Sequence, residues 1–149
     1  MAMRNKRKQT KYIVVCCSNT PVNNDWGSRE MDIEGRKEGL LEGGFHKVIK
    51  RDGTVEDGRD IDSAGGFLHY NMNKNKHQPT NKNSIGVVLI GGGTGTGQSD
   101  CNYTLEQFKS LKCLTDELKM EYPDVVEIIG HRDIFHTTEP HFNVQELLK

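Results

Sequence analysis

The amino-acid sequence lacks a long apolar run. No window approaches the roughly 18 apolar residues that a membrane-spanning helix needs. The basic residues near the N-terminus are not followed by the apolar core of a secretion signal. We therefore expect no membrane span and a protein that works in the cytoplasm.

The chain also lacks an excess of charge of one sign. Its 20 Lys and Arg residues nearly balance its 21 Asp and Glu residues, so we expect no clear nucleic-acid binding and no general attraction to an anionic membrane. The one charge cluster, residues 4–8 with Lys11, predicts a solvated basic arm over residues 1–11. The remaining length suits a single domain over residues 12–149.

The spacing of a disulfide framework is missing as well. The four cysteines, at positions 16, 17, 101 and 113, include an adjacent pair, which suits free thiols in a reducing compartment. Cys16 and Cys17 lie in a strand-like apolar run, so their side chains must point to opposite faces of a sheet. The thiol that faces a cleft is a candidate metal ligand or nucleophile; alternatively, both are core residues.

Two continuously apolar segments and one hairpin predict strands. Residues 12–18 and 83–90 are β-branched and continuously apolar, which is typical of central strands buried on both faces. Residues 45–51 and 54–56 flank Asp52-Gly53, which predicts a hairpin closed by a two-residue turn with positive φ angles.

Helical patterns fall between these segments. An irregular helix is predicted from a cap at Ser28 to about Gly39. Thr104 and Gln107 form a capping box that opens a second helix, and a short C-terminal helix is expected around Leu147. An apolar stripe marks the core face of the second helix: Leu105, Phe108, Leu111, Leu114 and Leu118. The order of elements predicts an α/β fold with a mixed central β-sheet flanked by helices.

Two segments predict loops. Residues 60–82 show no periodicity, and their Asn- and Lys-rich part, residues 72–82, is either a lid over a ligand or an inert surface insertion. The glycine-rich residues 91–97 could offer backbone N–H groups to a phosphate. No Lys-Ser or Lys-Thr follows at the spacing of a phosphate loop, so a connector is favoured.

Titratable groups concentrate after the last predicted strand. His131 and His136 lie within eleven residues of each other and of Asp133 and Glu139, and His131 would emerge at the C-terminal end of the strand, where open α/β sheets bind ligands. His131 and Glu139 could be two metal ligands eight residues apart; alternatively, His131 is a hydrogen-bonded surface group. The strand itself rests on four apolar residues: Val125, Val126, Ile128 and Ile129.

Six blocks of sequence, among them Gly-His-Arg-Asp, together resemble the N-acetylmuramoyl-L-alanine amidase family, which includes phage lysozymes and peptidoglycan recognition proteins. They are residues 13–18, 44–49, 51–55, 58–59, 83–87 and 130–133. The likeness extends over about residues 12–148 and is greatest to the short phage amidases. It implies an amidase-type fold and a zinc enzyme that cuts the amide between muramic acid and the first residue of the stem peptide.

The resemblance implies three zinc-ligand positions, which hold Cys16, His131 and Glu139 here. Only His131 is the residue type that the family uses. Cysteine, histidine and glutamate are all zinc ligands, but a thiolate with a carboxylate would make the metal less electrophilic than a shell richer in imidazole.

Other positions also depart from the family. Phe45 replaces a tyrosine that orients or deprotonates the water, and Val88 stands where some relatives have a glutamate. Glu34-Gly35 replaces a Trp-His pair, and Gly66 replaces a histidine of a loop. Thr137 matches the threonine of many recognition proteins.

These departures predict a catalytically impaired protein that binds a muropeptide or another small anionic molecule through Phe45, His46, Asn83 and His136. The alternative is an active zinc-dependent amidase, a peptidoglycan hydrolase or endolysin, with His46 or His136 as a substitute base and Thr137 in support. A third hypothesis, which rests on the resemblance alone, is a protein partner, as some phage amidases bind and inhibit the phage RNA polymerase. A phage-encoded chain would work in the host cytoplasm.

Overall fold

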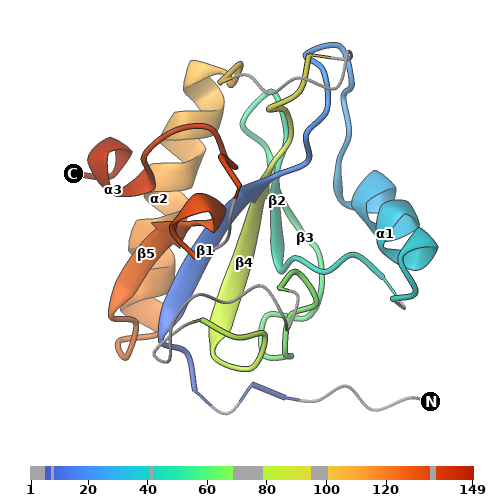
Figure 1. Ribbon diagram of the computed structural model, residues 1–149. Helices are drawn as coiled ribbons and strands as arrows, with labels where there is room; N and C mark the ends of the chain where they lie inside the picture. Colours follow the sequence, from blue (N-terminus) through green and yellow to red (C-terminus); the bar gives the residue numbers. More distant parts are fainter. Residues whose placement is uncertain (1–5, 8, 41, 69–78, 95–100, 135–136) are drawn as a thin grey trace.

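Figure 1 shows the computed structural model, which describes residues 6–7, 9–40, 42–68, 79–94, 101–134 and 137–149. Its elements in chain order are β1 (Tyr12–Cys17), α1 (Ser28–Lys37), β2 (Lys47–Ile49), β3 (Val55–Asp57), β4 (Ser84–Leu89), α2 (Leu105–Glu121), β5 (Glu127–Gly130), a 3₁₀ turn (His131–Asp133) and α3 (Val144–Leu147).

The strands form one mixed sheet in the order β3-β2-β4-β1-β5. β1 pairs in parallel with β4 and β5, β2 pairs in parallel with β4, and β3 is antiparallel to β2. The predicted α/β class with a mixed sheet is confirmed. Because the parallel strands end at the same edge, the residues after Cys17 and Gly130 come together there.

Alternation along the strands divides the core between two faces of the sheet. Ile13 and Val15 of β1 face α2 and α3, in a cluster with Leu111 of α2. Val14 and Cys16 face the other way, toward Phe67 and the loops on the side where α1 lies (Figure 1). The prediction that the two adjacent cysteines point to opposite faces is therefore confirmed.

The central strand β4 has a glycine for a packing reason. A Cβ built on Gly86 would lie 2.5 Å from the ring of Phe67, which is closer than any real contact. The absent side chain lets the buried Phe67 ring lie directly on the strand. The two predicted central strands thus correspond to β1 and β4.

The hairpin of β2 and β3 is confirmed, but the prediction of a two-residue turn is wrong. The Gly53 N–H donates to Lys50 O at 2.9 Å and the Lys50 N–H to Thr54 O at 2.8 Å, which leaves three residues in the turn. Among the two turn residues that the sequence singled out, only Gly53 has a positive φ, +91°. Asp52 caps the turn instead, because its Oδ1 accepts from the Thr54 N–H.

Two apolar residues that were assigned to the core are exposed. Leu105 is 63% exposed, because it is the first residue of α2 and its side chain lies outside the stripe that Leu111 and Leu118 continue. Val126 is 66% exposed and precedes β5, which is an edge strand that begins only at Glu127. The first helix is also capped at Gly27 rather than Ser28.

The described part of the N-terminal segment lies against the domain. Lys6 forms an isolated antiparallel bridge with Ser63. Arg7 donates to Ile61 O at 2.6 Å and to Ser63 O at 3.0 Å, and its guanidinium lies 5.3 Å from the centroid of the Tyr122 ring.

Two predicted loop features fall partly outside the described residues. Of the predicted lid, residues 72–78 are not described, and of the glycine-rich turn, residues 95–97 are not described. Within the described part of the chain, no helix has the length and apolar character to cross a membrane.

Candidate functional site

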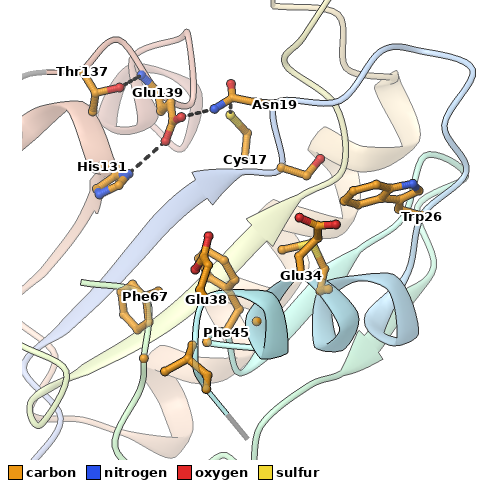
Figure 2. Close-up of a pocket in the computed structure, with 16 residues that line it drawn as sticks. Cys17, Asn19, Trp26, Glu34, Glu38, Phe45, Phe67, His131, Thr137 and Glu139 are labelled. Carbon is orange, nitrogen blue, oxygen red and sulfur yellow. Dashed lines mark hydrogen bonds and ion pairs between the residues drawn. The ribbon is translucent and has the colours of Figure 1, made fainter. Parts of the chain in front are cut away.

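A pocket of about 440 Å³ opens at the C-terminal edge of the parallel strands. Figure 2 shows its lining, which comes from the end of β1, the loop after it, α1, the residues before β2 and the segment after β5. Among the lining residues are Cys17, Asn19, Trp26, Glu34, Glu38, Phe45, Phe67, His131, Thr137 and Glu139. This pocket therefore lies at the sheet edge that was predicted for ligand binding.

The polar centre of this pocket is a hydrogen-bonded chain. His131 Nδ1 lies 3.1 Å from Glu139 Oε2, and the Asn19 amide donates to the other oxygen of the same carboxylate. The Glu139 backbone N–H donates to Thr137 Oγ1 at 3.2 Å. The three residues predicted in this segment, His131, Thr137 and Glu139, are thus brought together, with Asn19 from the other side of the pocket (Figure 2).

Asn19 connects this centre to two further groups. Its Oδ1 accepts from the Cys17 thiol at 3.3 Å and lies 3.1 Å from His141 Nε2. His141 in turn has its Nδ1 3.0 Å from Thr138 Oγ1. Asn19 also has φ of +58°, a left-handed conformation that asparagine tolerates better than most residues.

The environment of the pocket affects its acidic groups in opposite ways. Burial acts to raise the pKa of Glu139, but the hydrogen bonds from His131 and Asn19 outweigh it, so the pKa lies below its ordinary value. Burial raises the pKa of the Cys17 thiol to about 11. At neutral pH the pocket therefore holds a carboxylate beside a neutral thiol.

Part of the pocket lining is apolar, at Phe45 and Phe67. Phe45 stacks on Phe67, with ring centroids 5.5 Å apart and planes inclined by 21°. Val88 is fully buried beneath Phe45 and Trp26. Neither Phe45 nor Val88 can exchange a proton.

The sequence and the fold both match known proteins. Residues 6–142 match the family of N-acetylmuramoyl-L-alanine amidases. The endolysin of Enterobacteria phage K11 is 36% identical over 144 residues, which cover 97% of this chain and 89% of that protein. The chain belongs to the N-acetylmuramoyl-L-alanine amidase family. This amidase-family chain is thus peptidoglycan-related and similar to a phage endolysin.

Solved structures show the same fold for this amidase-family chain. The N-acetylmuramoyl-L-alanine amidase LysC from Clostridium intestinale superimposes with a TM-score of 0.74 at 22% identity, covering 98% of this chain and 87% of that one. Human PGRP-IBETAC, solved in complex with glycosamyl muramyl pentapeptide, has a TM-score of 0.67 at 12% identity, covering 94% of this chain and 82% of that one.

Members of the amidase family are generally zinc-dependent, but the residues present here do not fit a zinc centre as they are arranged. Among the described residues, no three His, Cys, Asp or Glu side chains are placed to hold a metal ion together. His131 and Glu139 bond to each other, and Asn19 occupies the remaining carboxylate oxygen. Cys16, the third predicted ligand, is 1% exposed and does not line the pocket. Burial, with the negative charge of Glu139, raises the pKa of its thiol well above the ordinary value.

The structure does not bring His46 to the pocket. This predicted base and binding residue is fully buried, with Nε2 2.8 Å from Ser63 O and with Nδ1 accepting from the Gly86 N–H at 3.0 Å. Burial lowers its pKa to about 4. Both ring nitrogens are occupied by the backbone, so the role of His46 in the structure is to join three segments of the fold.

Two other predicted binding residues also lie elsewhere. Asn83 lies just before β4, at the opposite edge of the sheet from the pocket, and its Oδ1 accepts from the Thr80 N–H and the Ser84 hydroxyl. His136 lies outside the described residues.

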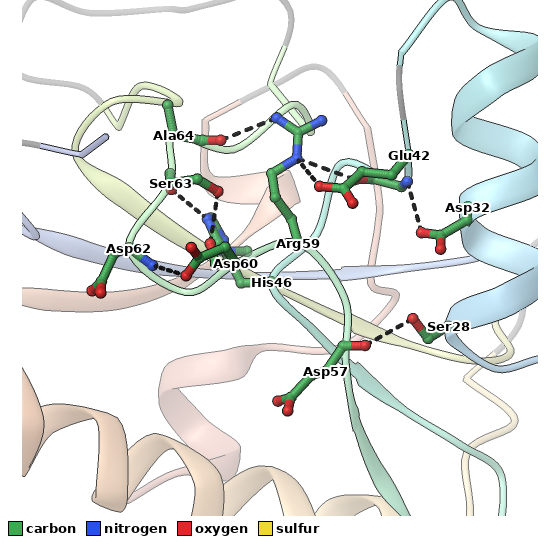
Figure 3. A network of polar contacts seen from close by, with 12 residues as sticks. Ser28, Asp32, Glu42, His46, Asp57, Arg59, Asp60, Asp62, Ser63 and Ala64 are labelled. Atoms are coloured by element: carbon green, nitrogen blue, oxygen red, sulfur yellow. Dashed lines mark hydrogen bonds and ion pairs between the residues drawn. The ribbon is translucent and has the colours of Figure 1, made fainter. Parts of the chain in front are cut away.

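Glu34-Gly35 stands where the resemblance to the family implies Trp-His. For Gly35, the structure shows a local reason for this difference. A Cβ on Gly35 would lie 2.2 Å from Glu42 O, so α1 approaches the following backbone more closely than a side chain would permit. At Gly66, a Cβ would lie 2.8 Å from the Arg59 guanidinium. Figure 3 shows this Arg59, which donates to Ala64 O and pairs with Glu42.

The glycine turn does not offer its described N–H groups to an anion. Gly91 N–H donates to Ser18 Oγ, Gly92 N–H to Asn102 Oδ1, and Gly93 N–H to Thr20 O. The pocket lining also contains three glutamates and, among the described residues, no lysine or arginine. The small anionic ligand expected from the sequence therefore has no complementary charge here.

Sequence reasoning missed several lining residues. Cys17 lines the pocket, although Cys16 was the predicted ligand. Asn19, Trp26, Glu38 and Phe67 were not singled out either. The available signals were weak: a polar residue just after the end of β1, and a lone tryptophan in the loop before α1.

Proposed function

We propose that this amidase-family protein binds a muropeptide in the pocket at the sheet edge and hydrolyses it weakly or not at all. One observation carries the proposal. At the centre of the pocket, His131 and Glu139 contact each other, and Glu139 also bonds to Asn19. Among the described residues, they are not arranged with a third side chain to bind a metal ion.

Among the described residues, the base candidates His46 and Glu139 do not suit the task, which supports impaired hydrolysis. A general base must reach the water that it deprotonates and must have a pKa near the working pH. His46 is buried with both nitrogens occupied, and Phe45 has no proton to exchange. Glu139, which does line the pocket, has a lowered pKa and is therefore a weak base. Loss of one such group typically costs about a hundredfold or more in rate.

The shape of the pocket supports retained binding. Its volume of about 440 Å³ is within the ordinary range for small-molecule sites, and such sites combine apolar walls with a few polar groups. Here Phe45 and Phe67 supply the apolar surface, and Asn19, His131 and Thr137 supply the polar groups. The muramyl pentapeptide in the complex of human PGRP-IBETAC shows that a protein of this fold binds such a ligand.

The test combines binding with restoration of hydrolysis. Calorimetry with a muramyl tripeptide measures binding, and release of soluble fragments from purified peptidoglycan measures hydrolysis, with zinc content determined for every sample. We expect the unaltered chain to bind but barely hydrolyse. The variant Phe45→Tyr, Cys16→His, Glu139→Cys should gain hydrolysis by about a hundredfold or more. The same variant with Phe45 retained is the matched control for the tyrosine.

The two alternatives predict different results. Robust turnover by the unaltered chain would reject impaired hydrolysis and establish the active zinc-dependent amidase. Failure to bind the muramyl tripeptide would reject the muropeptide as ligand, and a protein partner would become the leading hypothesis.

A further inference from the structure

The segment 137–142, which carries Glu139, contains no helix or strand. Two local hydrogen bonds shape it. The Arg132 N–H donates to Glu139 O at 2.6 Å, and the His141 N–H donates to Thr138 O at 2.6 Å. Because the segment has no strand or helix of its own, its position at the sheet edge also depends on contacts with residues that are distant in the chain.

Tyr103 makes a contact of this kind. It lies two residues before α2 and donates its hydroxyl to Pro140 O at 2.8 Å. Pro140 is buried, and a buried carbonyl needs a hydrogen-bond donor. Tyr103 does not line the pocket, whereas Glu139, the residue before Pro140, does. The hydroxyl therefore acts on the polar centre of the pocket through the backbone, without a place in the ligand's surroundings.

The ring of Tyr103 is held by aromatic packing. It meets Phe108 of α2 edge-on, with centroids 5.8 Å apart, and it meets Phe142 in the same way at 5.5 Å. Phe108 and Phe142 also pack edge to face, at 5.3 Å, and such arrangements are favourable. The position of the ring is thus fixed by its neighbours, so a phenylalanine at position 103 would keep the packing and lose only the hydroxyl.

The hydroxyl lies in a space that a glycine leaves open. A Cβ built on Gly92 would lie 2.8 Å from Tyr103 Oη and 2.9 Å from Cys17 Sγ. Gly92 also has a φ of +87°, which side chains rarely adopt. The hydroxyl and the pocket-lining thiol of Cys17 are therefore both adjacent to Gly92, at the point where the end of β1 approaches the segment after β5.

We propose that Tyr103 is a positioning residue for ligand binding, and that its hydroxyl sets the place of the Glu139 carboxylate by holding Pro140. Glu139 bonds to Asn19 and contacts His131, so a shift of its backbone would change both contacts. This inference rests on the proposed muropeptide binding and adds a residue that supports the pocket from outside its lining.

The first test compares two variants that each remove one tyrosine hydroxyl. Tyr103→Phe removes the bond to Pro140. Tyr122→Phe is the matched control, because the Tyr122 hydroxyl donates to Asp62 Oδ1 at 3.1 Å and Tyr122 does not line the pocket. Calorimetry with the muramyl tripeptide should show binding weakened by about fivefold in Tyr103→Phe. Tyr122→Phe should change the affinity by less than about twofold.

The second test uses the ligand-free protein. In NMR spectra, the side-chain amide signals of Asn19 report its bond to Glu139. These signals should shift in Tyr103→Phe and stay in place in Tyr122→Phe. A loss of overall stability alone would not move them, so this measurement separates positioning from a general structural role.

The outcomes separate this inference from the function on which it rests. Unchanged affinity in Tyr103→Phe, or an equal loss in both variants, overturns the positioning role. Weaker binding with unchanged Asn19 signals also overturns it, because the hydroxyl would then act by a route other than Glu139. If the unaltered chain does not bind the muramyl tripeptide, the proposed function fails. The Asn19 signals then decide the positioning role: a shift in Tyr103→Phe alone supports it, and any other result overturns it.

Discussion

Asn19 is the single residue on which the polar centre of the pocket depends most. Its amide donates to Glu139, and its Oδ1 accepts from Cys17 and lies within reach of His141. Asn19 thus connects the end of β1 to the segment after β5. The Asn19 amide therefore connects three side chains of the pocket region, those of Glu139, Cys17 and His141.

We expect Asn19→Asp to destabilise the protein by about 1 kcal/mol at pH 7. The substitution keeps the shape of the side chain but removes its N–H donors and places a second carboxylate beside Glu139. Urea unfolding measures the change. Asn23→Asp, at an exposed position of the same loop, adds the same charge and is the control. If both variants have the same stability, the bond to Glu139 contributes nothing measurable.

At the scale of elements, α2 is the helix with the clearest sequence signals. Its cap is formed as predicted: Thr104 Oγ1 accepts from the Gln107 N–H, and the Gln107 side chain accepts from the Thr104 N–H. Gln107 does more than cap, because its Nε2 also donates to Ile90 O at 2.8 Å and so fastens the helix to the end of β4. The capping box was predictable from local spacing, whereas this contact is tertiary.

We expect Leu111→Ala and Leu105→Ala to have very different effects, although both make the same change in one helix. Leu111 is fully buried against the sheet, so the loss of its side chain should lower the free energy of unfolding by about 2–5 kcal/mol. Leu105 is largely exposed, so its loss should cost less than about 0.5 kcal/mol. Thermal and urea unfolding of the two variants provide the comparison; similar losses would contradict the packing of α2.

At the scale of the whole molecule, His46 joins segments that are distant in the chain. Its ring lies between Ser63 of the long loop and Gly86 of β4, and Arg7 Nη1 lies 3.5 Å from Nε2. With one ring nitrogen donating and the other accepting, the neutral imidazole is fully satisfied. A second proton on Nδ1 would face the Gly86 N–H, and the positive charge of the imidazolium would be buried.

This arrangement predicts that stability falls as the solution becomes acidic. Burial, with the charges of Arg7 and Arg59, lowers the folded-state pKa of His46 from 6.5 to about 4. Between these values the unfolded chain binds more protons, so stability is fully present above about pH 6.5 and is lost as the pH falls toward 4. The loss from His46 should total about 3 kcal/mol.

The measurement is urea unfolding of the unaltered chain and of His46→Gln between pH 7.5 and pH 4. The variant should be less stable at pH 7.5, but it should lose less stability on acidification, because the other titrating groups are common to both proteins. Parallel pH profiles for the two proteins would show that His46 is not the acid-sensitive group.

The sequence by itself determined the strands β1 and β4, the hairpin, the helix α2 and the position of His131 after the last strand. Each of these follows from periodicity or capping within a few residues, which acts at short range in the chain. The amidase family was also readable from ordered blocks of sequence and is confirmed by the comparisons. For Val126 and Leu105 the same local patterns predicted burial, but both side chains are exposed. Residues at the edge of a sheet or the end of a helix can follow the same apolar pattern as residues in the interior.

Only the tertiary structure decided which of these residues meet at the pocket. It placed Cys17 rather than Cys16 at the lining and put Asn19 against Glu139, which lies 120 residues further along the chain. It also buried His46, because the backbone groups of Ser63 and Gly86 that satisfy its ring come from segments with no local relation to it. Contacts of this kind depend on how the sheet brings distant strands together, so they cannot be predicted from local patterns in the sequence.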